Sequence, residues 1–295
     1  MTDQRKTVFV TGSGGQLGSE IRKISHRFQD HRFVFLTHED LDIGDPQHVE
    51  RKLAPAKDDV IINAAAYTSV DRAEDEPENA RKANALGPEN LARLAAKSGC
   101  LLIHISTDYV FDGESPRPYK EEDTTAPRNM YGVTKLEGEQ AILKSHAQAI
   151  IIRTSWVYSS FGRNFVKTML DLGRKRGNVS VIFEQSGSPT HARDLAEVIL
   201  KIMQSVPDGL ALPQIYHYSN EGFISWYDFA KAIFELANVE CQVAPIEIED
   251  YPVRAVRPVN TVLNKGKIKR DFNVTIPYWR DSLRACLNEM QMVSQ

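Results

Sequence analysis

The stretch VTGSGGQLG, residues 10–18, stands directly after a short β-branched run and directly before a segment with helical spacing. It places Gly12, Gly15 and Gly18 where a strand turns into a helix. Glycines at such a turn let the backbone come close to a pyrophosphate, which the free N–H groups and the dipole of the helix N-terminus stabilise. Strand, glycines and helix follow one another in the required order. The stretch therefore predicts a dinucleotide-binding site at the start of an α/β fold.

Outward from this stretch, strands and helices alternate as far as residue 155. The strands are continuously apolar, which is typical of a parallel sheet that is buried on both faces. Asp45 and Pro46 have the residue types of an N-cap and a first-turn proline. The pattern predicts a Rossmann-type doubly wound parallel sheet, with strands at 7–12, 32–37, 59–66, 100–107 and 149–155 and helices at 17–28, 46–53, 78–99 and from 129 onward.

The second half of the chain is less regular. A strand is expected at 178–183 and helices at 191–204 and 225–237, with proline-bearing loops at 208–216 and 249–260. We therefore expect an NAD(P)-binding Rossmann domain in residues 1–160. Residues 161–295 should mainly form a smaller C-terminal substrate-binding lobe, with some segments returning to the main sheet.

Composition and charge exclude several classes of protein. The 295 residues carry 36 basic and 39 acidic side chains, so the net charge is −3 and does not indicate binding to nucleic acid or to a membrane surface. No apolar run is long enough to cross a bilayer. His and Cys residues show no metal-ligand spacing, so no metal site is expected. Three widely spaced cysteines, without a CxxC pair, favour the reducing cytoplasm: Cys100, Cys241 and Cys286.

The stretch NMYGVTK, residues 129–135, places Tyr131 and Lys135 one helical turn apart. A free tyrosine has a pKa of about 10, too high for efficient proton exchange near neutrality, and a nearby ammonium is expected to lower it. Alone, the pair is common on exposed helices. Because it lies between two buried strands, the pair favours the interpretation that Tyr131 is a proton donor and that Lys135 lowers its pKa. Together with the G-x-x-G-x-x-G spacing, it resembles the short-chain dehydrogenase/reductase superfamily.

A third catalytic side chain is expected at the end of the strand 100–107. Carboxyl ends of parallel strands are where ligands bind in open α/β sheets. The hydroxyl of Thr107 can hold a substrate carbonyl beside Tyr131, whereas Ser106 is interpreted as a polar strand terminus.

Most of the chain resembles one family within this superfamily, the dTDP-4-dehydrorhamnose reductases. The resemblance implies reduction of the 4-keto group of a dTDP-linked 4-keto-6-deoxy sugar with NADPH or NADH, which yields dTDP-L-rhamnose for cell-surface polysaccharide. The segments STDYVFDG and RTSWVY are specific to this branch. The motifs that carry the resemblance are GGQLG, NAAAYTSVDRAE, STDYVFDG, YGVTKLEGE, IIRTSWVYSSFGRNFVKTML, GSPT and RPVN.

The resemblance also assigns roles to individual residues. Tyr131 is implied as proton donor, Lys135 as its tuner and ribose ligand, and Thr107 as the hydroxyl that positions the carbonyl. Asp108 and Trp156 are implied as sugar contacts. Arg257 lies in the RP-x-N motif, and we interpret it as a clamp for the substrate diphosphate. The implied cofactor-binding residues are Gly12, Gly15, Gln16, Leu17, Asp42, Ile43, Ala66, Tyr67, Thr68, Tyr131 and Lys135.

Two departures from the family pattern bear on partners and cofactor. Family members that dimerise through magnesium use several glutamates. Glu20 matches one of them, but Arg193 stands where another is expected, so both a monomer and a homodimer remain open. The segment after the second strand contains Glu39 and no arginine for a 2′-phosphate, which leaves NADPH and NADH as alternatives.

One rival function is disfavoured by the sequence, and two others remain as alternatives. A nucleotide-sugar 4,6-dehydratase would need an Asp-Glu pair after the threonine, whereas Asp108 is followed by Tyr109. A 4-epimerase or another reductase of the same fold has the same Tyr/Lys pair. The regulatory subunit of methionine adenosyltransferase resembles these reductases but acts as a non-catalytic NADP-binding partner.

Overall fold

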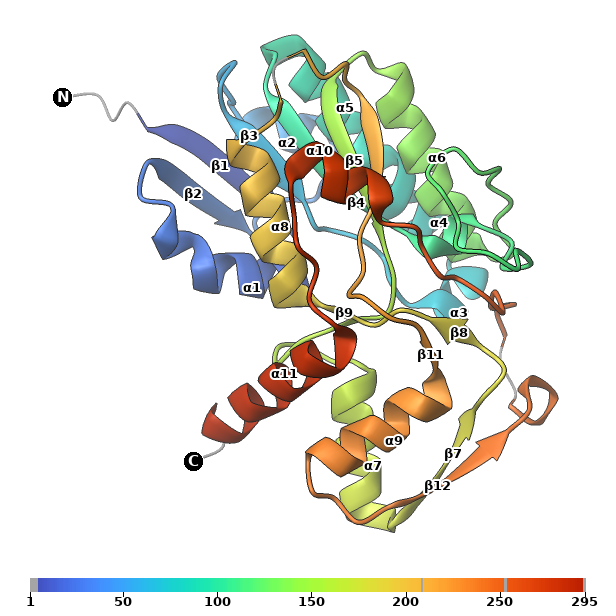
Figure 1. Cartoon of the computed structure of the whole chain (residues 1–295). Coiled ribbons are helices and arrows are strands. Elements are labelled where there is room, and N and C mark those ends of the chain that lie inside the picture. The colour runs from blue at the N-terminus through green and yellow to red at the C-terminus, as the bar shows by residue number, and fades with distance from the viewer. Residues whose placement is uncertain (1–4, 208, 252–253, 294–295) are drawn as a thin grey trace.

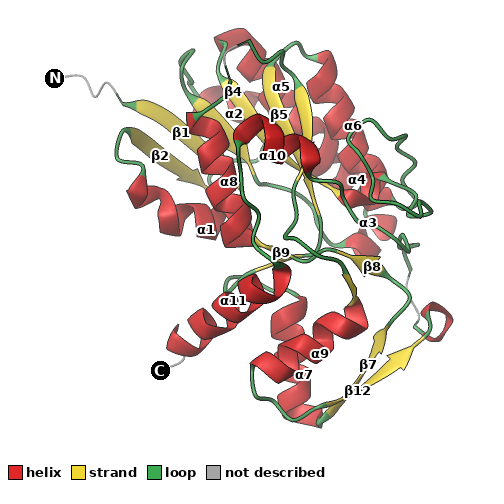
Figure 2. Ribbon diagram, in the orientation of Figure 1, coloured by secondary structure: helices red, strands yellow, loops and turns green. Residues whose placement is uncertain are grey.

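The computed structural model describes residues 5–207, 209–251 and 254–293, and within them six strands form one parallel sheet. Its order is β2-β1-β3-β4-β5-β10 (Figures 1 and 2). The α/β class and the doubly wound parallel sheet predicted from the sequence are confirmed. The strands are β1 (Lys6–Thr11), β2 (His31–Leu36), β3 (Val60–Asn63), β4 (Leu101–Thr107), β5 (Gln148–Thr154) and β10 (Gln214–His217).

Alternate residues of each strand point to opposite faces of the sheet. Helices cover both of these faces. Val8 and Val10 pack with the apolar sides of α1 (Gln16–Ile24), α8 (Ala192–Gln204) and α10 (Gly266–Phe272). Phe9 points the other way. There it packs in a core shared with α2 (Pro46–Lys52), α5 (Gly87–Ser98) and α6 (Met130–Lys144). Figure 1 shows α8 and α10 in front of the sheet, on the same side as α1.

Two expectations from the sequence are wrong in detail. Residues 208–216 were expected to form a loop, but Gln214–His217 form β10, the edge strand beside β5. The helix expected at 78–99 is divided into α4 (Pro77–Arg81), a π-helical turn η2 (Lys82–Leu86) and α5. Pro88 has no N–H for the carbonyl of Asn84, which accounts for the break in the regular hydrogen-bond pattern.

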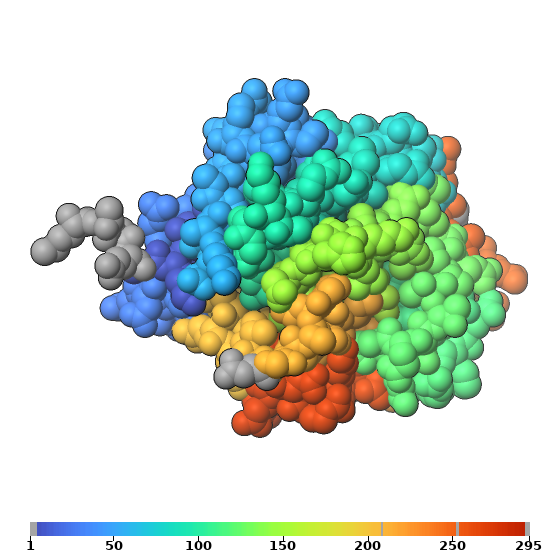
Figure 3. Space-filling model, turned by 90° about the horizontal axis from the view of Figure 1, so that it is seen from above, coloured from blue at the N-terminus to red at the C-terminus, as the bar shows by residue number. Residues whose placement is uncertain are grey.

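The second half of the chain also builds a smaller lobe below the sheet (Figure 1). Its core joins Tyr158, Val166, Phe229 and Leu283. Figure 3 shows the molecule from above, relative to the view of Figure 1. On this face the surface comes mostly from the first half of the chain, and segments after residue 190 lie against it. The elements of the smaller lobe are α7 (Phe165–Arg176), α9 (Trp226–Leu236), α11 (Trp279–Val293) and the paired strands β7 (Asn178–Ile182) and β12 (Gln242–Ile246).

Short elements connect the two regions. Two two-stranded pairs, β6 (Val157–Tyr158) with β9 (Thr190–His191) and β8 (Ser186–Gly187) with β11 (Ile224–Ser225), lie where the chain passes between them. On the sheet side, α3 (Val70–Asp75) follows β3, and the 3₁₀ turn η3 (Asp108–Val110) follows β4. The remaining 3₁₀ turns are η1 (Ser25–Arg27) and η4 (Ile248–Asp250).

The strand order reverses between β1 and β3. From β1 the chain moves outward to β2 and then returns to β3 on the other side of β1. Ligands of doubly wound folds bind outside the carboxyl ends of the strands at such a switch point. Thr11 and Asn63 are paired at these ends, and Thr107 pairs with Thr154 further along the same edge.

One buried ion pair fastens α6 to the sheet. The Arg153 guanidinium on β5 donates to both carboxylate oxygens of Glu139, with a shortest distance of 2.7 Å, and the two side chains are 3% and 1% exposed. Because the charges are desolvated, removing one leaves the other without compensation.

We therefore expect Arg153→Met to lower the free energy of unfolding by about 3–5 kcal/mol. Urea unfolding measures this loss. Replacing both partners, as Arg153→Met with Glu139→Gln, should restore part of it. Arg93→Met is the matched control, because Arg93 forms an exposed pair with Glu89 on α5, and should cost less than about 1 kcal/mol. Equal losses for the two arginines would contradict the expectation.

Candidate active site

In the glycine-rich turn between β1 and α1, the backbone packs so closely that two of the glycines have no room for a side chain. Gly12 has a φ of +65°, and a Cβ there would lie 2.5 Å from the Ala65 backbone nitrogen. A Cβ on Gly18 would lie 2.5 Å from the Cα of Ser13. Gly15 is the N-cap of α1, and no side chain caps the helix. The first-turn N–H groups of α1 are thus suited to an anion.

Gln16 and Leu17, both predicted to contact the cofactor, direct their side chains elsewhere. The Gln16 amide donates to the carbonyl oxygen of Val157 at 3.3 Å and accepts from Asn164 at 2.9 Å. Leu17 is buried in the core of the sheet. These two residues can therefore serve a pyrophosphate through their backbone N–H groups.

Asp42 and Ile43, implied as cofactor-binding residues, are neighbours in the chain, and Ile43 packs on the side of the sheet that α2 and α5 cover. Asp42 forms an ion pair with Lys82 at 2.7 Å, and the hydrogen bond from Lys82 is the largest cause that lowers the Asp42 pKa. Ile43 is buried against Gly87.

Ala66, Tyr67 and Thr68 follow β3 at the switch point. Ala66 and Thr68 are exposed, while Tyr67 is half-buried. The Tyr67 hydroxyl donates to Glu76 at 2.8 Å, and its backbone N–H donates to Asn84 Oδ1 at 2.9 Å. The segment is therefore held in place next to the glycine-rich turn, where Gly12 meets Ala65.

Thr107 and Asp108 are buried at the carboxyl end of β4. The Thr107 hydroxyl donates to Asp108 Oδ1 at 3.0 Å and accepts from the Tyr109 N–H. Burial raises the pKa of Asp108 to about 6 against the opposing effect of hydrogen bonds. Asp108 Oδ2 makes no hydrogen bond of normal geometry among the described residues, although the nearby Thr261 hydroxyl acts to lower the Asp108 pKa. It can accept a hydrogen bond from a ligand hydroxyl.

Tyr131 lies in the first turn of α6, whose N-cap Asn129 accepts from the Gly132 N–H at 2.8 Å. Its ring meets that of Tyr109 edge to face, with centroids 5.5 Å apart. Burial raises the pKa of Tyr131 to about 12, although a hydrogen bond with Thr107 lowers it. The lowering predicted from the sequence is therefore wrong for this structure, because desolvation outweighs it.

Lys135 is 1% exposed. Its Nζ donates to the Ile105 carbonyl oxygen at 2.6 Å and lies 3.3 Å from His104 Nε2. Burial lowers the pKa of Lys135 to about 8, and the charge of Glu139 opposes this. The amine is thus directed towards β4, one helical turn after Tyr131.

Trp156 stands in a left-handed conformation, with a φ of +48°. Its ring stacks on Trp226 at a centroid distance of 3.5 Å, and a Cβ on Gly187 would lie 2.7 Å from it. Such a conformation is uncommon for a large side chain and persists only where the surroundings fix it. The stack holds Trp156 at the boundary between the sheet and the smaller lobe.

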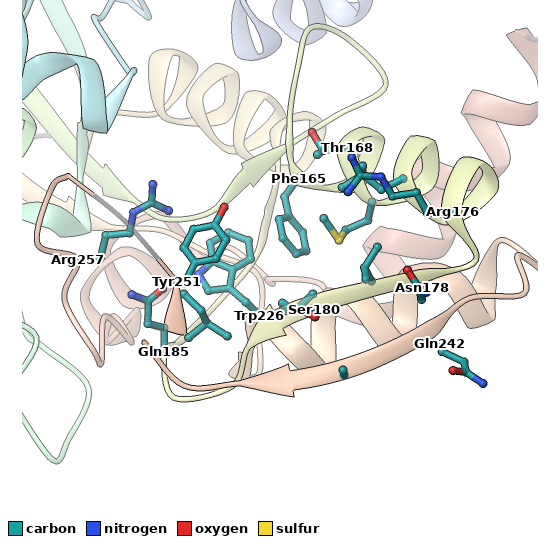
Figure 4. A pocket seen from close by; sticks show the side chains of 16 residues that line it. Phe165, Thr168, Arg176, Asn178, Ser180, Gln185, Trp226, Gln242, Tyr251 and Arg257 are labelled. Atoms are coloured by element: carbon teal, nitrogen blue, oxygen red, sulfur yellow. The ribbon is translucent and has the colours of Figure 1, made fainter. Parts of the chain in front are cut away.

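Arg257 reaches across to α3, where it donates to Asp71 Oδ2 at 2.8 Å. Its Nε has no partner among the described residues. Its charge also lowers the pKa of Tyr109, the ring neighbour of Tyr131, against the larger effect of burial. Arg257 lies at one end of a cavity of about 990 Å³, near Tyr251 and Trp226, while Arg176 lies at the other end (Figure 4).

Ion pairs join the region of Glu20 to α11. Glu20 is fully buried and accepts from Arg193 at 3.4 Å. Arg193 and Lys23 both pair with Glu289. In the described part of the chain, no three His, Cys, Asp or Glu side chains gather at a distance that would hold a metal ion. None of the helices in these ranges is long and apolar enough to cross a membrane.

The structure thus brings Thr107, Asp108, Tyr131 and Lys135 together at the carboxyl end of β4. Sequence reasoning missed His104, which contacts Lys135, and Tyr109, which contacts Tyr131. It also missed Asp71, the partner of Arg257. Tyr109 and Asp71 stand inside the motifs STDYVFDG and NAAAYTSVDRAE, which was the available signal. His104 lies within the apolar strand 100–107, and the order of apolar and polar residues in this strand gave no indication that His104 contacts Lys135.

Comparisons with known proteins agree with this geometry. The family model of the RmlD substrate binding domain matches residues 6–292. The chain is 40% identical to the dTDP-4-dehydrorhamnose reductase of Aggregatibacter actinomycetemcomitans over 285 residues, which cover 94% of this chain and 97% of the relative. The resemblance predicted from the motifs is confirmed.

Solved structures give the same result. A dTDP-4-dehydrorhamnose reductase from Clostridium acetobutylicum superposes with a TM-score of 0.90 at 37% identity, covering 97% of this chain and 100% of that chain. The enzyme of that name from Bacillus anthracis, in complex with NADP, superposes with a TM-score of 0.89 at 36% identity and the same coverage.

The buried amine of Lys135 should make stability depend on pH. Its pKa falls from 10.5 to about 8 on folding, so between these values the unfolded chain binds more protons. Stability should therefore rise with pH in this window, by about 3 kcal/mol relative to Lys135→Met. Urea unfolding of both proteins between pH 7 and about pH 10 measures the difference. Lys144→Met, at an exposed position of the same helix, should show no such difference. Parallel pH curves for wild type and Lys135→Met would contradict the expectation.

Proposed function

We propose that this chain, which belongs to the family of the RmlD substrate binding domain, is a dTDP-4-dehydrorhamnose reductase. It reduces the 4-keto group of dTDP-4-dehydro-L-rhamnose to give dTDP-L-rhamnose. The observation that carries the proposal is the meeting of Tyr131, Thr107 and Asp108 at the carboxyl end of β4. We expect the protein to work in the cytoplasm, as a monomer or a homodimer.

The residues around the switch point fit NADPH or NADH. Gly12 and Gly18 leave the backbone bare where a Cβ would clash, and the N-terminus of α1 has no side-chain cap. These features suit a pyrophosphate. Lys135 is our candidate for the ribose contact, and the segment 66–68 for one wall of the cofactor groove. When bound, the reduced nicotinamide supplies the hydride that reaches the sugar C4.

Tyr131 supplies the proton. Hydride arrival turns the keto oxygen into an alkoxide, which takes the proton from the Tyr131 hydroxyl. An alkoxide is a stronger base than a phenolate, so the transfer is downhill even from a phenol whose pKa is about 12. The raised pKa also keeps the hydroxyl protonated at every physiological pH.

Thr107 and Asp108 position the sugar. The Thr107 hydroxyl lies within hydrogen-bonding reach of Tyr131, so a carbonyl oxygen placed there meets both groups. The buried Oδ2 of Asp108 can accept from a ring hydroxyl. Trp156, fixed by its stack on Trp226, offers a flat apolar surface at the boundary with the smaller lobe.

Arg257 is our candidate for the diphosphate contact. Its guanidinium stands at the end of the cavity and has a donor to spare, because Asp71 takes only one side of the fork. A planar fork suits bidentate contacts to phosphate oxygens. Asp71 holds the side chain in a fixed direction.

One assay distinguishes the rival functions. A reductase consumes NADPH or NADH in equal amount with dTDP-4-dehydrorhamnose, an epimerase returns its bound cofactor unchanged, and a regulatory subunit binds without turnover. Supplying each reduced cofactor in turn also determines which of the two is preferred.

We expect Tyr131→Phe to lower turnover by about 10²-fold or more, the scale for losing a general acid, and to leave cofactor binding nearly intact. Steady-state kinetics and fluorescence titration with NADPH measure the two quantities. Tyr109→Phe is the matched control, because it removes the neighbouring hydroxyl and keeps the ring contact. Equal turnover in the two variants would contradict the assignment of Tyr131 as the proton donor.

Arg257→Ala should raise KM for the sugar nucleotide and leave KM for the cofactor unchanged, because the lost contact is to the diphosphate. Arg254→Ala provides the control. Arg254 comes from the same segment but pairs with Asp75 as a largely exposed side chain. Losses for both substrates would instead indicate a folding defect, and no loss would place Arg257 outside the binding site.

A further inference from the structure

The end of the edge strand β2 is where a doubly wound fold distinguishes NADH from NADPH. In such folds a carboxylate about 20 residues after the glycines binds the 2′-hydroxyl of the adenosine ribose, or an arginine nearby accommodates a 2′-phosphate. Here the chain leaves β2 through Thr37, His38 and Glu39. The first residue after the strand is therefore uncharged, and the side chains around it determine which cofactor fits.

The glycine-rich turn is attached to this strand end. The Ser13 N–H donates to the carbonyl oxygen of Leu36, the last residue of β2, at 3.0 Å. Next to it, a Cβ on Gly14 would lie 3.8 Å from Cγ2 of Thr37. The turn that suits a pyrophosphate and the strand end that discriminates at the ribose are therefore in direct contact.

Arg22 reaches the same place from the second turn of α1. Its guanidinium carbon lies 4.3 Å from the centroid of the Phe35 ring on β2, and its Nη2 donates to Ser13 Oγ at 3.2 Å. The stack and the hydrogen bond together hold a planar cation in one orientation. The segment after β2 has no arginine, so considering that segment alone misses a cation that the fold supplies from α1.

The guanidinium of Arg22 keeps donors for a ligand. Within residues 5–207, 209–251 and 254–293, its side chain makes one hydrogen bond, to Ser13, and no ion pair. A guanidinium has five N–H donors in a fixed fork, so most of them remain for phosphate oxygens. Arg22 is also exposed, which leaves it accessible from solvent.

The nearby carboxylates already have partners of their own. Asp40 Oδ2 accepts from the N–H and the hydroxyl of Thr37, at 2.9 and 2.8 Å. These hydrogen bonds hold the pKa of Asp40 below its usual value, and the charge of Arg22 adds to the effect. Asp42 pairs with Lys82 at 2.7 Å. Asp40 therefore caps its own turn, and Asp42 is neutralised by a neighbouring helix.

We propose that Arg22 and Ser13 form the site for the 2′-phosphate of NADPH, so that this chain prefers NADPH to NADH. The inference rests on the proposed function, because it takes the glycine-rich turn as the place of the cofactor pyrophosphate. The fork of Arg22 suits two phosphate oxygens, and the Ser13 hydroxyl can donate to another while it accepts from Arg22. NADH carries a hydroxyl at this position and leaves the cation without a counter-charge.

Fluorescence titration of the wild-type protein with NADPH and with NADH tests the preference without any sugar substrate. We expect NADPH to bind at least about 10-fold more tightly, the scale of a hydrogen bond between charged groups. The difference should shrink as ionic strength rises, because the site is exposed. Equal affinity for the two cofactors at low ionic strength would overturn the inference.

Arg22→Met removes the charge and keeps an apolar stem over Phe35. It should weaken the binding of NADPH by about 10-fold or more and change that of NADH by less than about 2-fold. Arg22→Lys restores the charge without the planar fork, so it should recover only part of the loss. Equal weakening of both cofactors in Arg22→Met, or no weakening of NADPH, would contradict the assignment.

Arg27→Met is the matched control for the loss of one exposed positive charge. Arg27 lies in η1, directly after α1, and pairs with Glu197. This variant should bind both cofactors as the wild type does. A loss of NADPH affinity equal to that of Arg22→Met would mean that net charge is responsible, and it would overturn the inference. A chain that shows the expected binding differences but fails in the sugar assay would refute the proposed function and support the 2′-phosphate site.

Discussion

The parallel sheet is buried on both faces, and this constraint determines where polar chemistry can lie. Helices cover both sides of β1, β3, β4 and β5. A polar side chain on these strands must therefore either stand at a strand end or find its partner inside the protein. Thr107 and Asp108 take the first course. Asn63 and His104 take the second, and both hydrogen-bond to buried neighbours.

The same burial sets the acid–base properties of the site. It raises the pKa of Tyr131 to about 12 and lowers that of Lys135 to about 8. Reasoning from spacing alone gave the opposite direction for the tyrosine, because it considered the neighbouring charge and not the loss of solvent. A desolvated phenol holds its proton until an alkoxide forms, but it is also a weaker proton donor than a free tyrosine.

Sequence reasoning was accurate where local pattern decides structure. The glycine-rich turn, the apolar strands and the cap at Asp45 follow from residue types within a few positions. It was inaccurate at Pro88, whose missing N–H divides the helix expected at 78–99, and where distant contacts decide. β10 is four residues long and lies next to a proline-bearing segment, so only its pairing with β5 makes it a strand. The depth of Tyr131 and the partner of His104 likewise depend on segments far away in the chain.

The smaller lobe is joined to the sheet on either side of the candidate active site. At the glycine-rich turn, the Gln16 side chain bonds to Val157 and Asn164, so the start of α1 is tied to the chain that enters the lobe. At the other side, Arg257 bonds to Asp71, which ties the loop leaving the lobe to α3. The groups we assign to the cofactor and to the substrate diphosphate thus each carry a bond between the two regions. Ligand contacts at either end would act on the same seam. Thr107 and Tyr131 lie on the sheet side of it, on β4 and α6, and the Arg153–Glu139 pair fastens α6 to β5, the strand beside β4.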